Sequence, residues 1–190
     1  QSFSAHNVSF DDLVFLNFFT LQKLSLIAST FSGFDLNQLN LMTKSLKNLT
    51  IIPIGTHDIS TLDNFESLKY LEIGDLDTAQ MDITPIAKLT HLQELKLIDL
   101  NIPNLRPLQV LDKLVELSLE GTQVKDWSGL ASLAHIKRLD LSYTQFGQGL
   151  ELSTLSHLSA LNDLNINYTP VNTLKPLFVL KNLHKLNMSH

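Results

Sequence analysis

Histidine is the residue type in this sequence best suited to catalysis or metal binding. The chain has seven histidines and no cysteine, which excludes thiol nucleophiles, disulfides and cysteine-ligated metals. His91 and His135 occupy the same place in two similar segments, each one residue before the start of a strand-like pattern. With one strand between them, strands about 4.8 Å apart would separate the two imidazoles by about 10 Å, too far to share an ion. We therefore expect polar turn residues and no metal site.

No segment marks a catalytic nucleophile. The sequence lacks a Gly-x-Ser-x-Gly elbow. Its Gly-x-Gly, at Gly147-Gln148-Gly149, lacks the context of a phosphate-binding loop, and we expect it to relax an insertion in its unit. Trp127 falls at an inward position of the pattern described below and is expected in the core. We predict no catalytic site and no cofactor, so the chain is not expected to be an enzyme.

Composition and charge narrow the class of partner. The 190 residues include 14 basic and 19 acidic side chains, for a net charge of -5. Without an overall excess of lysine and arginine, nucleic acid is not the expected partner. No window approaches the roughly 18 to 20 apolar residues that a membrane span needs. The composition therefore favours one soluble domain and argues against nucleic acid as its partner.

Repeated units must position any surface site. The pattern Leu92-Gln-Glu-Leu95-Lys-Leu97 returns 22 residues later as Leu114-Val-Glu-Leu117-Ser-Leu119. We number each unit from its first leucine or isoleucine; positions 4 and 6 then have the two-residue period of a strand. Further units follow at intervals of 22, 24 or 25 residues, and the eight starts are Leu21, Leu46, Leu68, Leu92, Leu114, Ile136, Leu161 and Leu183. We predict eight parallel strands in register, stacked so that neighbouring units share one core.

The segment after each strand returns the chain to the next unit. Its apolar residues recur at positions 11, 14, 17 and 20, as in Ile102, Leu105, Leu108 and Leu111, and again in Val124, Trp127, Leu130 and Leu133. A step of three suits 3₁₀ turns or a short helix. Pro85, Pro107 and Pro176 fit the first turn of such helices. Asp58, Asp82 and Asp126 are the expected N-caps.

Residues 1–20 do not follow the leucine pattern. Ser9-Phe10-Asp11-Asp12 is expected to cap a short helix that carries the aromatic residues up to Phe19. An exposed first repeat needs a cover, so we predict an N-terminal cap at 1–20 and a repeat domain at 21–190. The last repeat is incomplete at His190.

The repeats resemble a known family. The strand pattern, followed by Asp82-Ile-Thr-Pro-Ile-Ala-Lys-Leu-Thr-His-Leu92 or by Val124-Lys-Asp-Trp-Ser-Gly-Leu-Ala-Ser-Leu133, is similar to bacterial leucine-rich repeats of the internalin-like, 22-residue type. The resemblance covers residues 21–190. It implies an α/β solenoid of about eight repeats, with a curved parallel β-sheet on the concave side and short 3₁₀ or α turns on the convex side. It also implies a secreted or surface protein of a bacterium, of the virulence type.

One position departs from that family pattern. Such repeats carry asparagine at position 9, where its amide bonds backbone groups along the turn. Here the position holds Ser29, Ile54, Leu76, Leu100, Thr122, Thr144 and Thr169. A threonine hydroxyl can make one such bond, whereas isoleucine and leucine cannot. We therefore expect the second half of the solenoid to be more regular than the first.

The concave face is the predicted interaction surface. Positions 3, 5, 7 and 8 are free of the core. Tyr143 and Tyr168 share position 8 of neighbouring units, with Arg138 and Asp140 on one unit and Asp163 and Asn165 on the next. Tyrosine and arginine dominate binding hot spots. We expect a protein partner to dock across the last four strands, steered on its basic side by an acidic strip of Glu72, Glu94, Glu116 and Glu120.

Three other interpretations remain open. The concave face could be a solvated polar surface without a partner. The two tyrosines would then do no more than shield the sheet edge and pack on each other. The chain could be the recognition domain of a larger secreted bacterial effector or enzyme whose catalytic part lies outside it. The repeats could also be purely structural, within a surface stalk.

Overall fold

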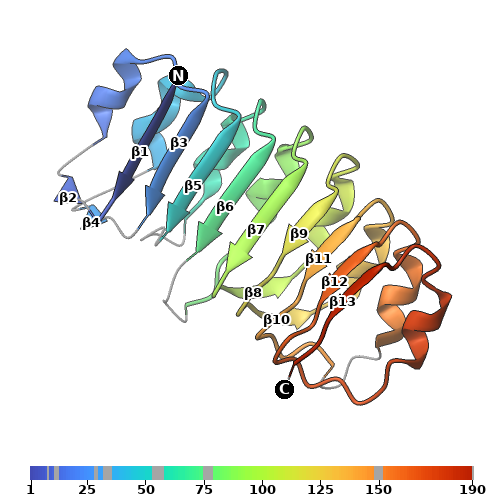
Figure 1. The fold of residues 1–190 in the computed structure, drawn as a ribbon. Coiled ribbons are helices and arrows are strands. Elements are labelled where there is room, and N and C mark those ends of the chain that lie inside the picture. Colours follow the sequence, from blue (N-terminus) through green and yellow to red (C-terminus); the bar gives the residue numbers. More distant parts are fainter. Residues whose placement is uncertain are drawn as a thin grey trace.

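The computed structural model describes residues 1–7, 9–10, 13–27, 30–31, 36–52, 58–74, 79–147 and 152–189. Strands and 3₁₀ helices alternate along the chain, so the strands form one face of a solenoid and the 3₁₀ helices form the other (Figure 1). The two ends of the chain lie at opposite ends of the stack. This is the predicted leucine-rich-repeat architecture.

The main sheet has nine parallel strands in the order of the chain. They are β1 (Ser2–His6), β3 (Lys23–Ile27), β5 (Asn48–Ile52), β6 (Tyr70–Gly74), β7 (Glu94–Ile98), β9 (Glu116–Ser118), β11 (Arg138–Asp140), β12 (Asp163–Asn165) and β13 (Lys185–Asn187). Each unit position lies beside the same position of the next unit, as in Leu95, Leu117 and Leu139. The eight predicted strands are confirmed, in register, and β1 adds a ninth.

The core is a column of aliphatic side chains between the two faces. The inward residues Leu95 and Leu117 are fully buried, as are the return-segment residues Leu105 and Leu108. Trp127 is buried as predicted, with its ring 5.0 Å from that of Phe146 in the next unit. Since each unit has too few apolar residues for a core of its own, stacking supplies the burial.

The return segments form 3₁₀ helices of five to seven residues. They are η1 (Val14–Phe18), η2 (Leu36–Met42), η3 (Ser60–Asn64), η4 (Thr84–Lys88), η5 (Arg106–Val110), η6 (Ser128–Ser132), η7 (Leu152–His157) and η8 (Lys175–Val179). The three prolines occupy the first turn of η4, η5 and η8, as predicted, where no backbone donor is lost.

The three aspartates predicted as N-caps lie one residue earlier. The N-cap residues are Ile59, Ile83 and Trp127, none of which caps through its side chain. Instead, Asp58, Asp82 and Asp126 each accept a hydrogen bond, 2.9 Å long, from the backbone N–H two residues later. Hydrogen bonds from that later residue lower the pKa of all three carboxyls. The aspartates therefore form Asx turns that start the helices.

The N-terminal segment differs from its prediction. Residues 2–6 form β1, which pairs with β3 and aligns Phe3 with Leu24 and Ala5 with Leu26. Ser9 and Phe10 form a short strand, β2, which pairs with β4 (Thr30–Phe31), so this part does not cap a helix. The residue before η1 is Leu13, whose N–H donates to Gln38 Oε1 at 3.0 Å. Asp11 and Asp12 lie outside the described residues, and the role of 1–20 as a cap stays a prediction.

Threonine at position 9 ties neighbouring units together. The hydroxyl of Thr122 donates to the Leu97 carbonyl of the preceding unit at 2.7 Å, and that of Thr169 donates to the Leu141 carbonyl at 2.9 Å. Thr144 donates to the same Leu141 carbonyl at 2.7 Å. All three side chains are buried, which confirms the predicted hydroxyl bonds. The corresponding Ser29, Ile54 and Leu76 lie outside the described residues.

Other parts of the solenoid are less regular. A second small sheet pairs β8 (Asn101–Asn104) with β10 (Gln123–Asp126). Gly147 has φ +101°, and a Cβ there would lie 2.8 Å from the Pro170 carbonyl oxygen, so only glycine fits. Gln148 and Gly149, predicted with it to relax an insertion, lie outside the described residues. None of the described helices has the length and apolar character needed to cross a membrane.

Candidate binding face of the sheet

The backbone turns left-handed at position 8 of several units, and at the matching residue that follows β1. At position 8, Asn7, Asp99, Gly121, Tyr143 and Tyr168 have φ of 55°, 55°, 67°, 58° and 52°. This conformation keeps the position-8 N–H directed at the next unit: Gly121 donates to the Ser142 carbonyl at 2.9 Å, and Tyr143 donates to the Asn167 carbonyl at 2.9 Å. The hydrogen bonds between units thus continue past the end of the strand while the chain turns toward the return segment.

Two tyrosines occupy this left-handed position in neighbouring units. The rings of Tyr143 and Tyr168 stack with centroids 4.7 Å apart and planes at 19°. Their side chains remain 56% and 52% exposed. A bulky residue at positive φ costs on the order of 1–3 kcal/mol of backbone strain. The predicted adjacency of the tyrosines is therefore confirmed, at positions where glycine or asparagine would be less strained.

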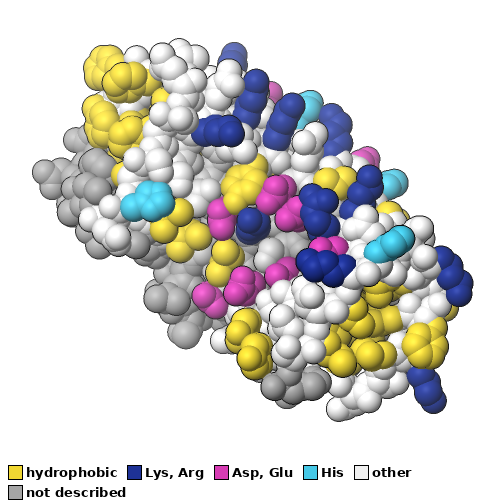
Figure 2. Space-filling model, viewed as in Figure 1, with side chains coloured by type: hydrophobic (Ala, Val, Ile, Leu, Met, Phe, Trp, Pro, Cys, Tyr) yellow, Lys and Arg dark blue, Asp and Glu magenta, His cyan; other side chains and the backbone are white. Residues whose placement is uncertain are grey.

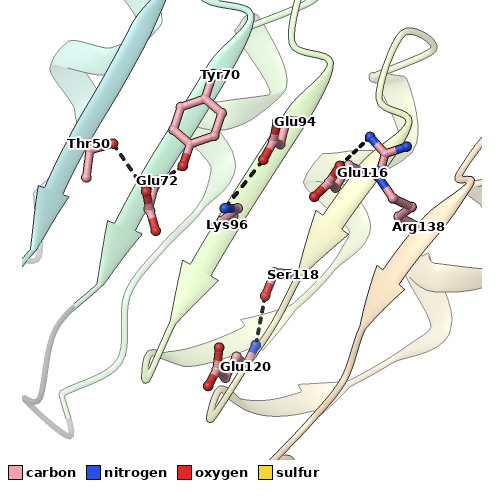
Figure 3. A network of polar contacts seen from close by, with 9 residues as sticks. All are labelled: Thr50, Tyr70, Glu72, Glu94, Lys96, Glu116, Ser118, Glu120 and Arg138. Atoms are coloured by element: carbon pink, nitrogen blue, oxygen red, sulfur yellow. Dashed lines mark hydrogen bonds and ion pairs between the residues drawn. The ribbon is translucent and has the colours of Figure 1, made fainter. Parts of the chain in front are cut away.

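Position 3, at the start of each strand, carries a row of opposite charges. Arg138 contacts Glu116 on the preceding strand through both Nε and Nη2, and Lys185 Nζ lies 3.0 Å from Asp163 Oδ2 (Figure 3 shows the first pair). Position 5 contributes Lys96, whose Nζ lies 3.5 Å from Glu94 Oε1. The charges of these side chains are thus compensated within the protein.

Glu72 of the predicted acidic strip is held by hydroxyl groups. Tyr70 donates to Glu72 Oε2 at 2.5 Å, and Thr50 donates to the same oxygen at 3.2 Å (Figure 3). Burial, and then the hydrogen bond to Glu72, raise the pKa of Tyr70 to about 12. Lys96 Nζ lies 5.4 Å from the centre of the Tyr70 ring. Burial lowers the pKa of Lys96, but the charges of Tyr70 and Glu72 outweigh it, so the pKa is raised.

Glu120 differs from the other acids of the strip. Burial, followed by the charges of Asp140 and Asp99, raises the pKa of its carboxyl. Asp140 accepts hydrogen bonds from the Ser142 N–H at 2.8 Å and from Asn165 Nδ2 at 2.9 Å, which orient it without neutralising it. In the described part of the chain none of these three acids forms an ion pair. They make the strand-end part of the face acidic.

The predicted site residues fall into two groups. A hollow of about 370 Å³ on the sheet face is lined by seven of them, Glu72, Glu116, Glu120, Arg138, Asp140, Asp163 and Asn165. Glu94 lies beside it through its contact with Lys96. Figure 2 shows acidic side chains gathered in the middle of this face. Tyr143 and Tyr168 lie beyond the strand ends and do not line the hollow, so Arg138 belongs with Glu116 rather than with the tyrosines.

Several side chains of this face were not predicted as site residues. Lys96 and Lys185 line the hollow, and Tyr70 orients Glu72. A sequence signal for the cations existed, since opposite charges occupy the same unit position in consecutive units, as in Asp163 and Lys185. The role of Tyr70 depends on its side-chain direction and had no such signal.

Two of the histidines lie apart from this face, whereas His6 is the last residue of β1 in the main sheet. His91 and His135 are exposed in the turns before β7 and β11, with the unit of β9 between them. Among the described residues, no three histidine, aspartate or glutamate side chains are grouped so as to hold a metal ion. His190 lies outside the described residues.

Comparison with solved structures identifies the type of solenoid. An internalin (inlF) from Listeria monocytogenes superposes with a TM-score of 0.81 and 29% identity, over 97% of this chain and 53% of that one. Internalin C2 (inlC2) from the same species superposes with a TM-score of 0.80 and 26% identity, over 99% of this chain and 80% of that one. The chain thus spans about half the length of the first. No protein-family model and no curated protein matches the sequence.

Proposed function

We propose that this internalin-like leucine-rich-repeat chain is a non-catalytic module that binds a protein partner on its concave face. The observation that carries the proposal is the exposed stack of Tyr143 and Tyr168. Both rings stand on strained backbone, and neither is needed to fill the core. Stacked, half-exposed tyrosines offer rigid contact area at low entropic cost, which is typical of binding hot spots.

The charged part of the face supports a particular orientation of the partner. Glu72, Glu94 and Glu116 have their charge or hydrogen-bonding capacity engaged within the protein, whereas Glu120, Asp99 and Asp140 form no ion pair among the described residues. The basic side of the partner therefore faces the acids at the strand ends, next to the tyrosines. Asp163, Asn165 and Arg138 bound the docking area on the strand side.

A photo-crosslinking experiment tests the docking site. A benzoylphenylalanine at position 168 should capture a defined protein from a lysate of the organism's host or neighbouring cells, and the same group at Phe178 on the opposite, helical face should not. Competition with unlabelled protein should abolish the product, whereas competition with a Tyr143→Ala, Tyr168→Ala variant should not. If the folded double variant competes as well as the native protein, the tyrosines are not the site.

The second candidate is a recognition domain within a larger secreted bacterial effector or enzyme. The inlF chain, of which this sequence matches about half, shows that the same solenoid occurs within a longer polypeptide. The coding sequence on either side of residues 1–190 tests this candidate, because a fused catalytic domain would support it.

A further inference from the structure

Positive charge is concentrated along one border of the sheet. We define the strand-start edge, from η2 onward, as the last residue of each 3₁₀ helix and the residues that connect it to the next strand of the main sheet. Its segments are 42–47, 64–69, 88–93, 110–115, 132–137, 157–162 and 179–184. They contain seven of the 14 basic residues but only two of the 19 acidic ones, Glu66 and Asp112. The seven are Lys44, Lys47, Lys69, Lys88, Lys113, Lys137 and Lys181. In Figure 2, Lys and Arg side chains follow the upper border of the face, where the strands begin.

The opposite border has the reverse composition. The described residues that follow the strands carry the acids Asp58, Asp82, Asp99, Glu120 and Asp126 and a single lysine, Lys125. A strand of about five steps separates the two borders by roughly 16 Å. Since the Debye length is about 8 Å at physiological ionic strength, the acids are largely screened from the lysines. The net charge of -5 therefore conceals a locally basic surface.

The lysines of this edge are available to a ligand. All seven are exposed. Only Lys181 is engaged, with Nζ 3.2 Å from the Phe178 carbonyl; the other six form no ion pair or side-chain hydrogen bond within the described residues. By contrast, Lys96, Arg138 and Lys185, a few residues away on the sheet face, all have acidic partners. These cations on the sheet face thus form ion pairs within the protein, whereas the lysines just before the strands form none among the described residues.

The backbone aligns these lysines in a row. At position 2, each N–H donates to the position-2 carbonyl of the preceding unit, as from Lys69 to Lys47 at 2.8 Å and from Lys137 to Val115 at 2.8 Å. This ladder fixes one residue per unit along the stack axis, and the neighbouring turn adds Lys44, Lys88 or Lys113 beside it. With strands about 4.8 Å apart, the seven turns span roughly 29 Å. The result is a narrow, straight ridge of cations rather than a pocket.

We propose that the strand-start edge is a second binding surface, which takes a linear sulfated polysaccharide. A ridge one or two lysines wide fits a flexible chain with charges along its length better than it fits a folded acidic domain. The ridge segments, all of which the structure describes, contain no exposed phenylalanine, tyrosine or tryptophan for the bases of single-stranded nucleic acid to stack on; their exposed aromatic residues are histidines. Arginine, the usual bidentate reader of phosphate, is missing from them as well.

The test uses heparin as the probe and unsulfated heparosan as the chain control. The logarithm of the binding constant for heparin should fall linearly with the logarithm of salt concentration, as expected when counter-ions of the ligand are released. A Lys47→Gln, Lys69→Gln, Lys137→Gln variant should lose on the order of ten-fold in affinity at low salt, with a salt slope smaller by about two to three. A matched variant, Arg106→Gln, Lys125→Gln, Lys175→Gln, has the same net charge but an intact ridge, and it should bind like the native protein.

The proposal is overturned if the native protein does not bind heparin at low salt. It is also overturned if both triple variants lose affinity equally, since net charge alone would then explain binding. Heparosan, a thymidine oligonucleotide or polyglutamate binding as tightly as heparin would remove the assignment to sulfated polysaccharide. Retained heparin binding by the Tyr143→Ala, Tyr168→Ala variant would support two separate surfaces, and its loss would contradict them. Thermal denaturation of each variant verifies the fold.

Discussion

The two ends of the strands carry different chemistry on the same leucine core. At the start of the strands, the backbone N–H groups of positions 2 and 3 bond the preceding unit, and the side chains there form a lysine ridge beside a row of paired charges. At the end of the strands, position 8 is left-handed and carries the tyrosine stack, beside three acids that form no ion pair among the described residues. The inward leucines are the same at both ends. The chemistry of each border of the sheet therefore depends on which residues occupy positions 2, 3 and 8 of the units, and not on the leucines of the core.

Leu117→Ala should have the largest effect, because this side chain supports both ends. It is fully buried and aligned with Leu95 and Leu139 of the adjacent strands. Removing a buried leucine costs about 2–5 kcal/mol. Chemical denaturation measures the loss. Hydrogen exchange should quicken in β7 and β11 as well, since repeats couple to their neighbours; unchanged protection there would contradict the stacking.

Gly121→Ala tests the left-handed backbone at the strand ends. The φ of Gly121 is +67°, so alanine should cost about 1–2 kcal/mol. Gly121→Asn is the matched control, because asparagine tolerates this conformation better. A Cβ meets the flexible Asp99 carboxylate in both variants, so the difference between them reports backbone strain. Equal unfolding free energies for alanine and asparagine would show that position 8 is not constrained in this way.

The ion pair between Arg138 and Glu116 tests the compensated row at the strand starts. The two side chains are 49% and 24% exposed. A double-mutant cycle with Arg138→Ala and Glu116→Ala should give a coupling energy of about 0.2–1 kcal/mol that decreases with salt. A coupling of zero at low salt would mean that the row is not held by its charges.

Glu120→Gln should have the smallest effect, and one that depends on pH. The pKa of Glu120 is raised in the folded protein, so its ionised form opposes folding above that pKa. The penalty disappears as pH falls below the ordinary value of 4.5. The glutamine variant should therefore be slightly more stable than the native protein at about pH 7 and equal to it at about pH 3.5. Urea denaturation at both pH values measures this, and the opposite pH trend would refute it.

The sequence predicted those features that depend on the spacing of apolar residues. Eight strands and the prolines of the return helices follow from the two-residue and three-residue steps around residues such as Leu95 and Leu108. Strand β1 escaped prediction because its inward positions hold Phe3 and Ala5 instead of leucines. The left-handed tyrosines escaped it because tyrosine does not signal positive φ. The hydrogen bond from Tyr70 to Glu72 escaped it because it depends on the tyrosine rotamer, which spacing does not encode.

The direction of the inter-unit hydrogen bonds has a mechanical consequence. Strand ladders, the position-2 and position-8 N–H groups and the hydroxyls of Thr122 and Thr169 all bond one unit to its neighbour along the stack. A tensile force applied to the two ends of the chain acts along these bonds. It therefore breaks the interfaces between units one after another, whereas a shearing force would act on all of them at once. We expect the protein to extend in an optical trap by peeling off units at low force, beginning at an end.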